Sequence, residues 1–153
     1  MRPFFEWCDQ LPVGVAIRDS KYIFPIVETF HLLAMTVLLG TVLILSLRLM
    51  GLGLRRQPLP VVAKALRPFT DWSIVVMLTS GFLLFSSEAI KCYENPPFFF
   101  KMGALALAIA FHFAAIRPLA GSEPGRLKAA VTGIASFLLW FSVAAGGRAI
   151  GFY

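Results

Sequence analysis

One long apolar stretch constrains the fold of this chain more than any other feature. The stretch covers residues 24–50, and it holds nineteen consecutive uncharged residues from Thr29 to Leu47. At about 1.5 Å of rise per residue, a helix of that length crosses a bilayer core of roughly 30 Å. The stretch therefore predicts a transmembrane helix, and the rest of the fold must be compatible with a lipid bilayer.

The overall composition agrees with a membrane protein. Of the 153 residues, 58% are hydrophobic and only 14% are charged, which differs from the usage of a soluble domain. The formal net charge is +6, but the basic residues flank apolar runs and form no stripe, so we expect no nucleic acid as a partner. We predict one transmembrane domain over residues 1–153, with the lipid bilayer as its surroundings.

Three more apolar runs follow the first, separated by connectors that contain Gly and Pro. The expected spans cover, approximately, residues 22–50, 70–88, 97–117 and 128–147. Residues 1–21 mix aromatic and charged side chains, which is typical of a short amphipathic helix in the membrane interface. The predicted fold class is all-α: an integral membrane four-helix bundle of up-down-up-down topology with a short N-terminal interfacial helix.

The distribution of basic residues orients the expected bundle. Eight of the fourteen Lys and Arg residues lie in the connectors after the first and third spans, together with only two acidic residues. Because cytoplasmic loops carry an excess of Lys and Arg, we expect both termini on the outer side. Cys8 and Cys92 then share that side, where a disulfide and a pair of free thiols are both open alternatives.

Two histidines lie inside the expected spans, where polar groups are costly and usually functional. His31 follows Lys21 by ten residues, and His112 follows Lys101 by eleven. If both lysines mark the outer boundary, both imidazoles lie about 15 Å below it. The first and third helices of such a bundle face each other across its core. The pair therefore predicts the axial ligands of one b-type haem.

Other residues fit the haem hypothesis without proving it. Ala108 lies on the same face as His112, and a small side chain there leaves space for a flat macrocycle, although such faces also let helices pack closely. Glu28 lies one turn from His31 and is expected to support it. Lys101 and Arg148 are candidates for the haem propionates, although snorkelling to the interface explains them equally.

The haem hypothesis predicts electron transfer, with a quinone or a partner redox subunit completing the path, and it leaves a homo-oligomer open. An alternative is a copper-handling protein, with Met77 and Met35 joining the two histidines as soft ligands. Methionines more often fill gaps in an apolar core. A third possibility is an accessory subunit without a cofactor, whose polar residues lock helix packing. No hydrolytic or transferase motif occurs, so enzymatic activity is uncertain.

Two blocks of the sequence are distinctive: FPIVETFH at residues 24–31 and SEAIKCYENP at residues 87–96. With several shorter blocks, they resemble a family of small four-helix bacterial inner-membrane proteins of uncharacterised function, over about Ala16 to Phe152. The resemblance implies a multi-pass protein of the bacterial inner membrane, for which the loop charges predict periplasmic termini. It implies no activity, so the expected function rests on the residues alone.

Overall fold

The fold was obtained as a computed structural model that describes residues 2–122 and 124–152. Throughout these two ranges the regular structure is helical, and they contain no β-strand. Three short helices lie outside the long ones: α1 (Arg2–Asp9), α2 (Pro12–Asp19) and α5 (Ala89–Tyr93). The long helices are α3 (Ile23–Leu49), α4 (Leu59–Ser87), α6 (Pro96–Phe111) and α8 (Arg126–Ile150). A π-helical turn, His112–Ile116, joins α6 to α7 (Arg117–Ala120).

Four helical stretches are long and apolar enough to cross a membrane: Ile23–Leu49, Leu59–Ser87, Pro96–Ala120 and Arg126–Ile150. The second begins eleven residues before the expected span of 70–88. Pro58 precedes this helix and Pro60 lies in its first turn, where a missing N–H disrupts no hydrogen bond. These prolines therefore begin α4, whereas the sequence analysis assigned them to a connector between two spans.

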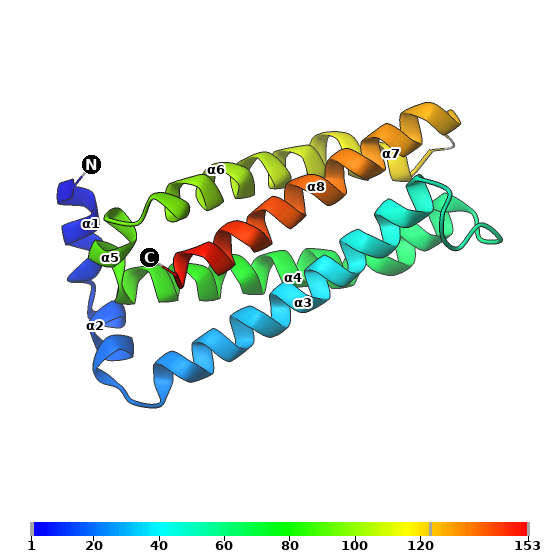
Figure 1. The fold of residues 1–153 in the computed structure, drawn as a ribbon. Helices are drawn as coiled ribbons and strands as arrows, with labels where there is room; N and C mark the ends of the chain where they lie inside the picture. The colour runs from blue at the N-terminus through cyan, green and yellow to red at the C-terminus, as the bar shows by residue number, and fades with distance from the viewer. Residues whose placement is uncertain (1, 123, 153) are drawn as a thin grey trace.

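The long helices lie alongside one another (Figure 1). Helix α3 packs against α4 and α8, and α6 packs against α8. Both chain termini, with α1, α2 and α5, lie at one end of the molecule, which we call the terminal end. The connection between α3 and α4 and the connection between α7 and α8 lie at the other end, which we call the basic end.

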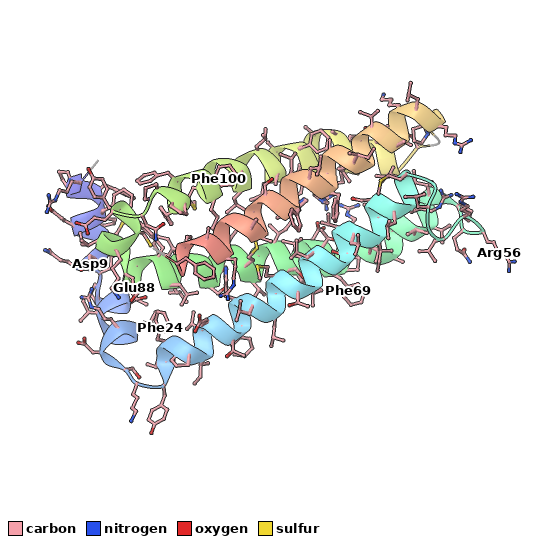
Figure 2. All side chains as sticks on the ribbon, viewed as in Figure 1. Asp9, Phe24, Arg56, Phe69, Glu88 and Phe100 are labelled. Atoms are coloured by element: carbon pink, nitrogen blue, oxygen red, sulfur yellow. The ribbon has the colours of Figure 1, made fainter. Side chains whose placement is uncertain are left out.

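The interior is apolar near mid-length, and so is much of the outer surface. Large side chains such as Phe69 and Phe100 are about 60% exposed and project outward from their helices (Figure 2). Apolar surface on this scale is unfavourable in water and suits contact with lipid. The buried residues at mid-length form one cluster, the central core: Ala34, Leu38, Val42, Ile74, Met77, Leu105, Ala108, Trp140 and Val143.

Helix α3 ends at the basic end in a Schellman motif. The N–H of Leu52 donates to the carbonyl of Leu47 (2.9 Å), and the N–H of Gly51 donates to the carbonyl of Arg48 (3.1 Å). Gly51 has a φ of +72°, which glycine adopts without steric cost. The side chain of Arg48 then donates twice to the carbonyl of Gln57, at 2.9 and 2.7 Å, and closes the loop that leads to α4.

At the terminal end the expected interfacial segment forms two helices instead of one. Phe5 and Cys8 of α1 are buried together with Ala89 of α5. Arg18 of α2 forms an ion pair with Asp9 at 2.8 Å, which fixes the angle between α1 and α2. Cys8 and Cys92 are both free thiols, although both belong to this packed cluster, so the structure contains the second of the two open alternatives.

Candidate functional site

His31 lies in the half of the bundle near the terminal end. Its Nδ1 is 3.0 Å from the hydroxyl oxygen of Ser80 on α4. The neighbouring Gly81 leaves room for the ring, because a Cβ there would lie 3.2 Å from Cε1 of His31. His31 thus joins α3 to α4 through one hydrogen bond and one close contact.

His112 lies beside a different part of α4. It lines a cavity together with Arg67 and Thr70, and Thr70 precedes Ser80 by ten residues. Ten residues of α-helix correspond to about 15 Å, so the two imidazoles lie at different levels of the bundle. The structure therefore does not place the two histidines at one level along the bundle, as the count from Lys21 and Lys101 had predicted. Lys101 lies within α6 and packs against Gly146 and Gly147 of α8, whereas Lys21 precedes α3.

This separation bears on whether the two histidines fit one haem. Two axial ligands bind one iron atom from opposite faces of the macrocycle, so their imidazoles must lie at one level. His31 and His112 do not fulfil this condition. Ala108, expected to leave space for the macrocycle, is 1% exposed and packed within the central core. The residues therefore do not fit a haem held by both histidines.

The four candidate ligands of the copper alternative are also spread along the bundle. Met77 is buried in the central core and Met35 is half-buried on α3, one turn from His31, whereas His112 lies nearer the basic end. Within residues 2–122 and 124–152, no group of three or more His, Cys, Asp or Glu side chains is placed to hold a metal ion. The four expected soft ligands are thus not gathered at one point.

The remaining candidates are also dispersed. Glu28 is exposed on α3, and it makes no side-chain hydrogen bond or ion pair with any described residue. The guanidinium of Arg148 stacks on Phe152, 4.9 Å from the ring centroid. Lys101 packs along Gly146 and Gly147 of α8, and a Cβ on Gly147 would lie 3.4 Å from its Nζ. None of these three contacts His112.

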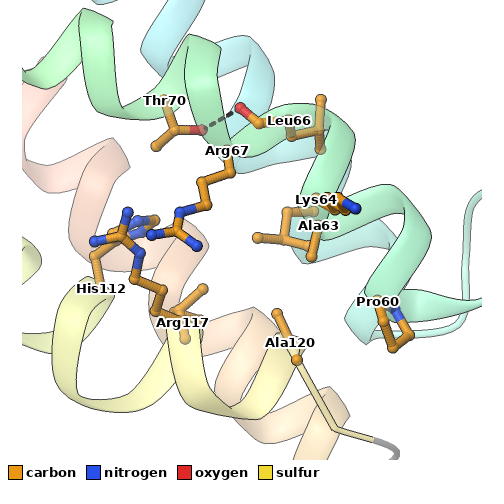
Figure 3. Close-up of a pocket in the computed structure, with 12 residues that line it drawn as sticks. Pro60, Ala63, Lys64, Leu66, Arg67, Thr70, His112, Arg117 and Ala120 are labelled. Carbon is orange, nitrogen blue, oxygen red and sulfur yellow. Dashed lines mark hydrogen bonds between the residues drawn. The ribbon is translucent and has the colours of Figure 1, made fainter.

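The structure instead places a cavity of about 160 Å³ between α4 and the α6–α7 segment, at the basic end, with a lining that is mostly apolar but includes several polar residues. Its polar lining residues are Lys64, Arg67, Thr70, His112 and Arg117. Arg67, His112 and Arg117 point into the same space (Figure 3). The imidazole of His112 is only 6% exposed, so it is a buried polar group on the wall of a cavity.

Three polar atoms in this region are buried and have no protein partner. Nδ1 of His112 and Nε of Arg117 belong to residues that line the cavity, and Oδ1 belongs to Asp71, which pairs with Arg117 beside it. The other oxygen of Asp71 is satisfied, since Oδ2 accepts from Nη2 of Arg117 at 2.5 Å and lies 3.6 Å from Nε of Arg67. An unsatisfied buried polar group costs roughly 1–3 kcal/mol, so such groups are rare. The unused hydrogen-bonding capacity of these three atoms makes this region the candidate site.

The π-helical turn explains how His112 and Arg117 come together. Pro118 has no N–H to donate to the carbonyl of Ala114, and its ring would clash with that carbonyl in a regular α-helix. The wider turn over His112–Ile116 relieves this conflict, and it brings residues five apart onto one side. The guanidinium of Arg117 also lies over the ring of Phe113, 4.9 Å from its centroid.

The cavity has an excess of positive charge. Lys64, Arg67 and Arg117 provide three cations, and Asp71 provides one anion, which leaves two positive charges in excess. The sequence analysis missed Asp71 and Arg117 because it counted them only as loop charges. One sequence signal could have pointed to Arg117 as a site residue. It is the pair Arg117-Pro118 at the end of an apolar run that already contains a histidine.

The comparisons with known proteins give a family and no activity. The model of a family of unknown function, DUF6644, matches residues 4–153. No curated protein and no solved structure matches the chain.

Proposed function

The chain belongs to DUF6644, a family of unknown function, and we propose its function from the cavity at the basic end. We infer that the protein is a four-pass protein of the bacterial inner membrane, with up-down-up-down topology and periplasmic termini. Its basic end then faces the cytoplasm, in agreement with the positive-inside rule. Its function is to bind a small anion, such as hydrogen phosphate, in the cavity lined by His112.

The observation that carries this proposal is the set of three unpartnered atoms on Asp71, His112 and Arg117. Hydrogen phosphate has oxygens that accept and a hydroxyl that donates. It can therefore accept from Nε of Arg117 and from a protonated Nδ1 of His112, and donate to Oδ1 of Asp71. The excess of two positive charges favours an anion over a neutral or cationic ligand.

The size of the cavity supports the same class of ligand. Its volume of about 160 Å³ is close to the roughly 150 Å³ of a cavity known to hold benzene in another protein. A tetrahedral oxyanion fits this space, and a whole haem does not. Haem-linked electron transfer, with or without a quinone, stays a prediction from the sequence for which no contact in the bundle gives support.

We assign His31 to helix packing, which was the third possibility raised by the sequence. Its hydrogen bond to Ser80 joins neighbouring helices at a level remote from the cavity. Hydrogen bonds of this kind between transmembrane helices contribute on average about 0.6 kcal/mol. The two histidines therefore have separate roles, and they provide a matched pair of variants.

The test is a phosphate titration of the purified protein in neutral detergent at low salt, followed by calorimetry. We expect saturable binding that His112→Ala weakens roughly ten- to hundredfold, because a hydrogen bond to a charged group contributes about 1.5–3 kcal/mol. His31→Ala is the control and should bind as the wild type does. Equal affinities in the two variants, or no binding by the folded wild type, would contradict the proposal.

A visible spectrum and a metal analysis of the same sample test the two alternatives, a haem and a copper site. A Soret band lost in both histidine variants would establish a haem between them and overturn the separate roles. A sample that contains stoichiometric copper, lost in both variants, would do the same for the copper alternative.

A further inference from the structure

A second pocket opens at the basic end, and it shares no lining residue with the cavity of His112. Its volume is about 490 Å³. It lies between the end of α3, the following loop and the start of α8, and its walls include Arg48, Leu49, Arg55, Leu59, Pro124 and Arg126. Three arginines thus surround one hollow, and none of its described lining residues is acidic.

The loop holds two of these arginines in place without using all their donors. Arg48 donates through Nε and Nη2 to the carbonyl of Gln57, and Nε of Arg55 donates to the carbonyl of Gly51. A guanidinium has five N–H groups, so both side chains keep donors on their terminal nitrogens. Leu54 between them has a φ of +50°, a conformation that costs a non-glycine residue energy.

The place of the pocket at the ends of apolar helices favours a lipid as its ligand. Helix α3 ends at Leu49 and α8 begins at Arg126, so the pocket lies at the ends of two stretches that can cross a membrane. Lipid phosphates lie at this level of a bilayer. Leu49, Leu59 and Ala129 provide apolar wall next to the arginines, which suits the glycerol and first methylenes of a lipid.

We propose that this pocket binds the headgroup of an anionic glycerophospholipid, with Arg48, Arg55 and Arg126 on its phosphodiester. Guanidinium groups bind phosphate oxygens through paired hydrogen bonds, and basic pockets between transmembrane helices bind anionic lipids in this way. The site is independent of the anion site at His112, because the two have different walls.

The experiment compares thermal unfolding in neutral detergent after addition of phosphatidylglycerol, phosphatidylcholine or inorganic phosphate. The test variant is Arg55→Gln with Arg126→Gln, which leaves the loop-closing Arg48 intact. The matched control is Lys21→Gln with Arg148→Gln, which removes the same charge at the terminal end. The His112→Ala background weakens phosphate binding at the other site and so reduces its contribution.

We expect phosphatidylglycerol to raise the unfolding midpoint of the wild type and the control, and phosphatidylcholine to have no effect. The lipid concentration for half of this shift should rise at least tenfold in the test variant, since each surface arginine contributes about 1 kcal/mol to the binding of anionic lipid. Equal shifts in the test and control variants would overturn the proposal. So would an equal shift with inorganic phosphate, which would make the ligand a free anion.

Discussion

At Gly133 the absence of a side chain lets α8 approach α3. A Cβ at this position would lie 2.9 Å from Cβ of Leu49 and 2.9 Å from the carbonyl oxygen of Ser46. The second contact is with backbone, which cannot rotate away. Gly103 on α6 is the opposite case, because a Cβ there would meet nothing within 4 Å.

We therefore expect Gly133→Ala to destabilise the protein by about 1–3 kcal/mol, since overpacking forces the helices apart. Gly103→Ala should leave the stability unchanged or raise it slightly, because alanine is the better helix former. Unfolding in a mixed detergent series measures both. Equal stability of the two variants would show that α3 and α8 do not pack at Gly133.

Cys92 provides a pH-dependent prediction outside the membrane-spanning helices. Burial, and then the nearby carboxylate of Glu88, raise the pKa of its thiol to about 11. The folded state therefore holds this proton more tightly than the unfolded state does. The resulting stability is complete below pH 9, the ordinary pKa of the thiol, and is lost as the pH rises toward 11.

The same shift predicts slow alkylation. In a Cys8→Ser background, the rate of reaction of Cys92 with iodoacetamide should increase about tenfold per pH unit from pH 8 to above pH 10, because the thiolate is the nucleophile. Glu88→Gln should move the whole profile to lower pH. A midpoint at the ordinary value for a thiol in the folded protein would contradict the burial of Cys92.

Among the elements, the π-helical turn at His112–Ile116 has the most specific effect on the site. Around a regular α-helix, His112 and Arg117 would be separated by about 140°, so they would not share one cavity. Pro118→Ala removes the conflict that favours the wider turn. We expect this variant to be more stable than the wild type and to bind phosphate more weakly.

The control for this prediction is Pro68→Ala, because Pro68 lies inside α4 where no π-helical turn occurs. The Pro68→Ala variant should also be more stable than the wild type, because it removes a proline ring that clashes with the carbonyl four residues earlier in the helix. Its phosphate affinity should not change. Thermal unfolding and calorimetry give the two quantities. If both variants keep the affinity of the wild type, the turn does not position Arg117.

The sequence predicted the long helices well, because sustained apolar runs have few alternative structures. It placed the start of α4 at about residue 70, since Lys64, Arg67 and Asp71 interrupt the apolar pattern. In the structure these three residues continue the helix beyond its apolar part. The π-helical turn could not be predicted, because it changes the hydrogen-bond register and leaves the apolar pattern nearly unaltered.

At the scale of the whole molecule, the separation of His31 from His112 makes a further prediction. Substitutions more than about 10 Å apart, with no shared partner, usually add in their effects on stability. The double variant His31→Ala, His112→Ala should therefore lose the sum of the stability lost in the single variants. Reversible unfolding of the four proteins in detergent measures this. A double variant no less stable than either single one would indicate a shared ligand.

The relative depth of His31 and His112 could not be predicted from the sequence, for a geometric reason. Counting from Lys21 and Lys101 assumed that both lysines lie at one boundary. Helix α3 begins two residues after Lys21, whereas Lys101 is already in the second turn of α6. The ion pair between Asp71 and Arg117 could not be predicted from the sequence either, because its members are 46 residues apart.

The central core separates the polar groups of the two ends, and this has an electrical consequence. Its members are all apolar, from Leu38 and Met77 to Trp140, so this part of the bundle has a low dielectric constant. Such a layer acts as an insulator, and a transmembrane voltage falls mainly across it. Charges on either side of such a layer are screened only weakly, because the Coulomb interaction strengthens as the dielectric constant falls. Helix α4 crosses the layer and carries both Ser80 and Asp71.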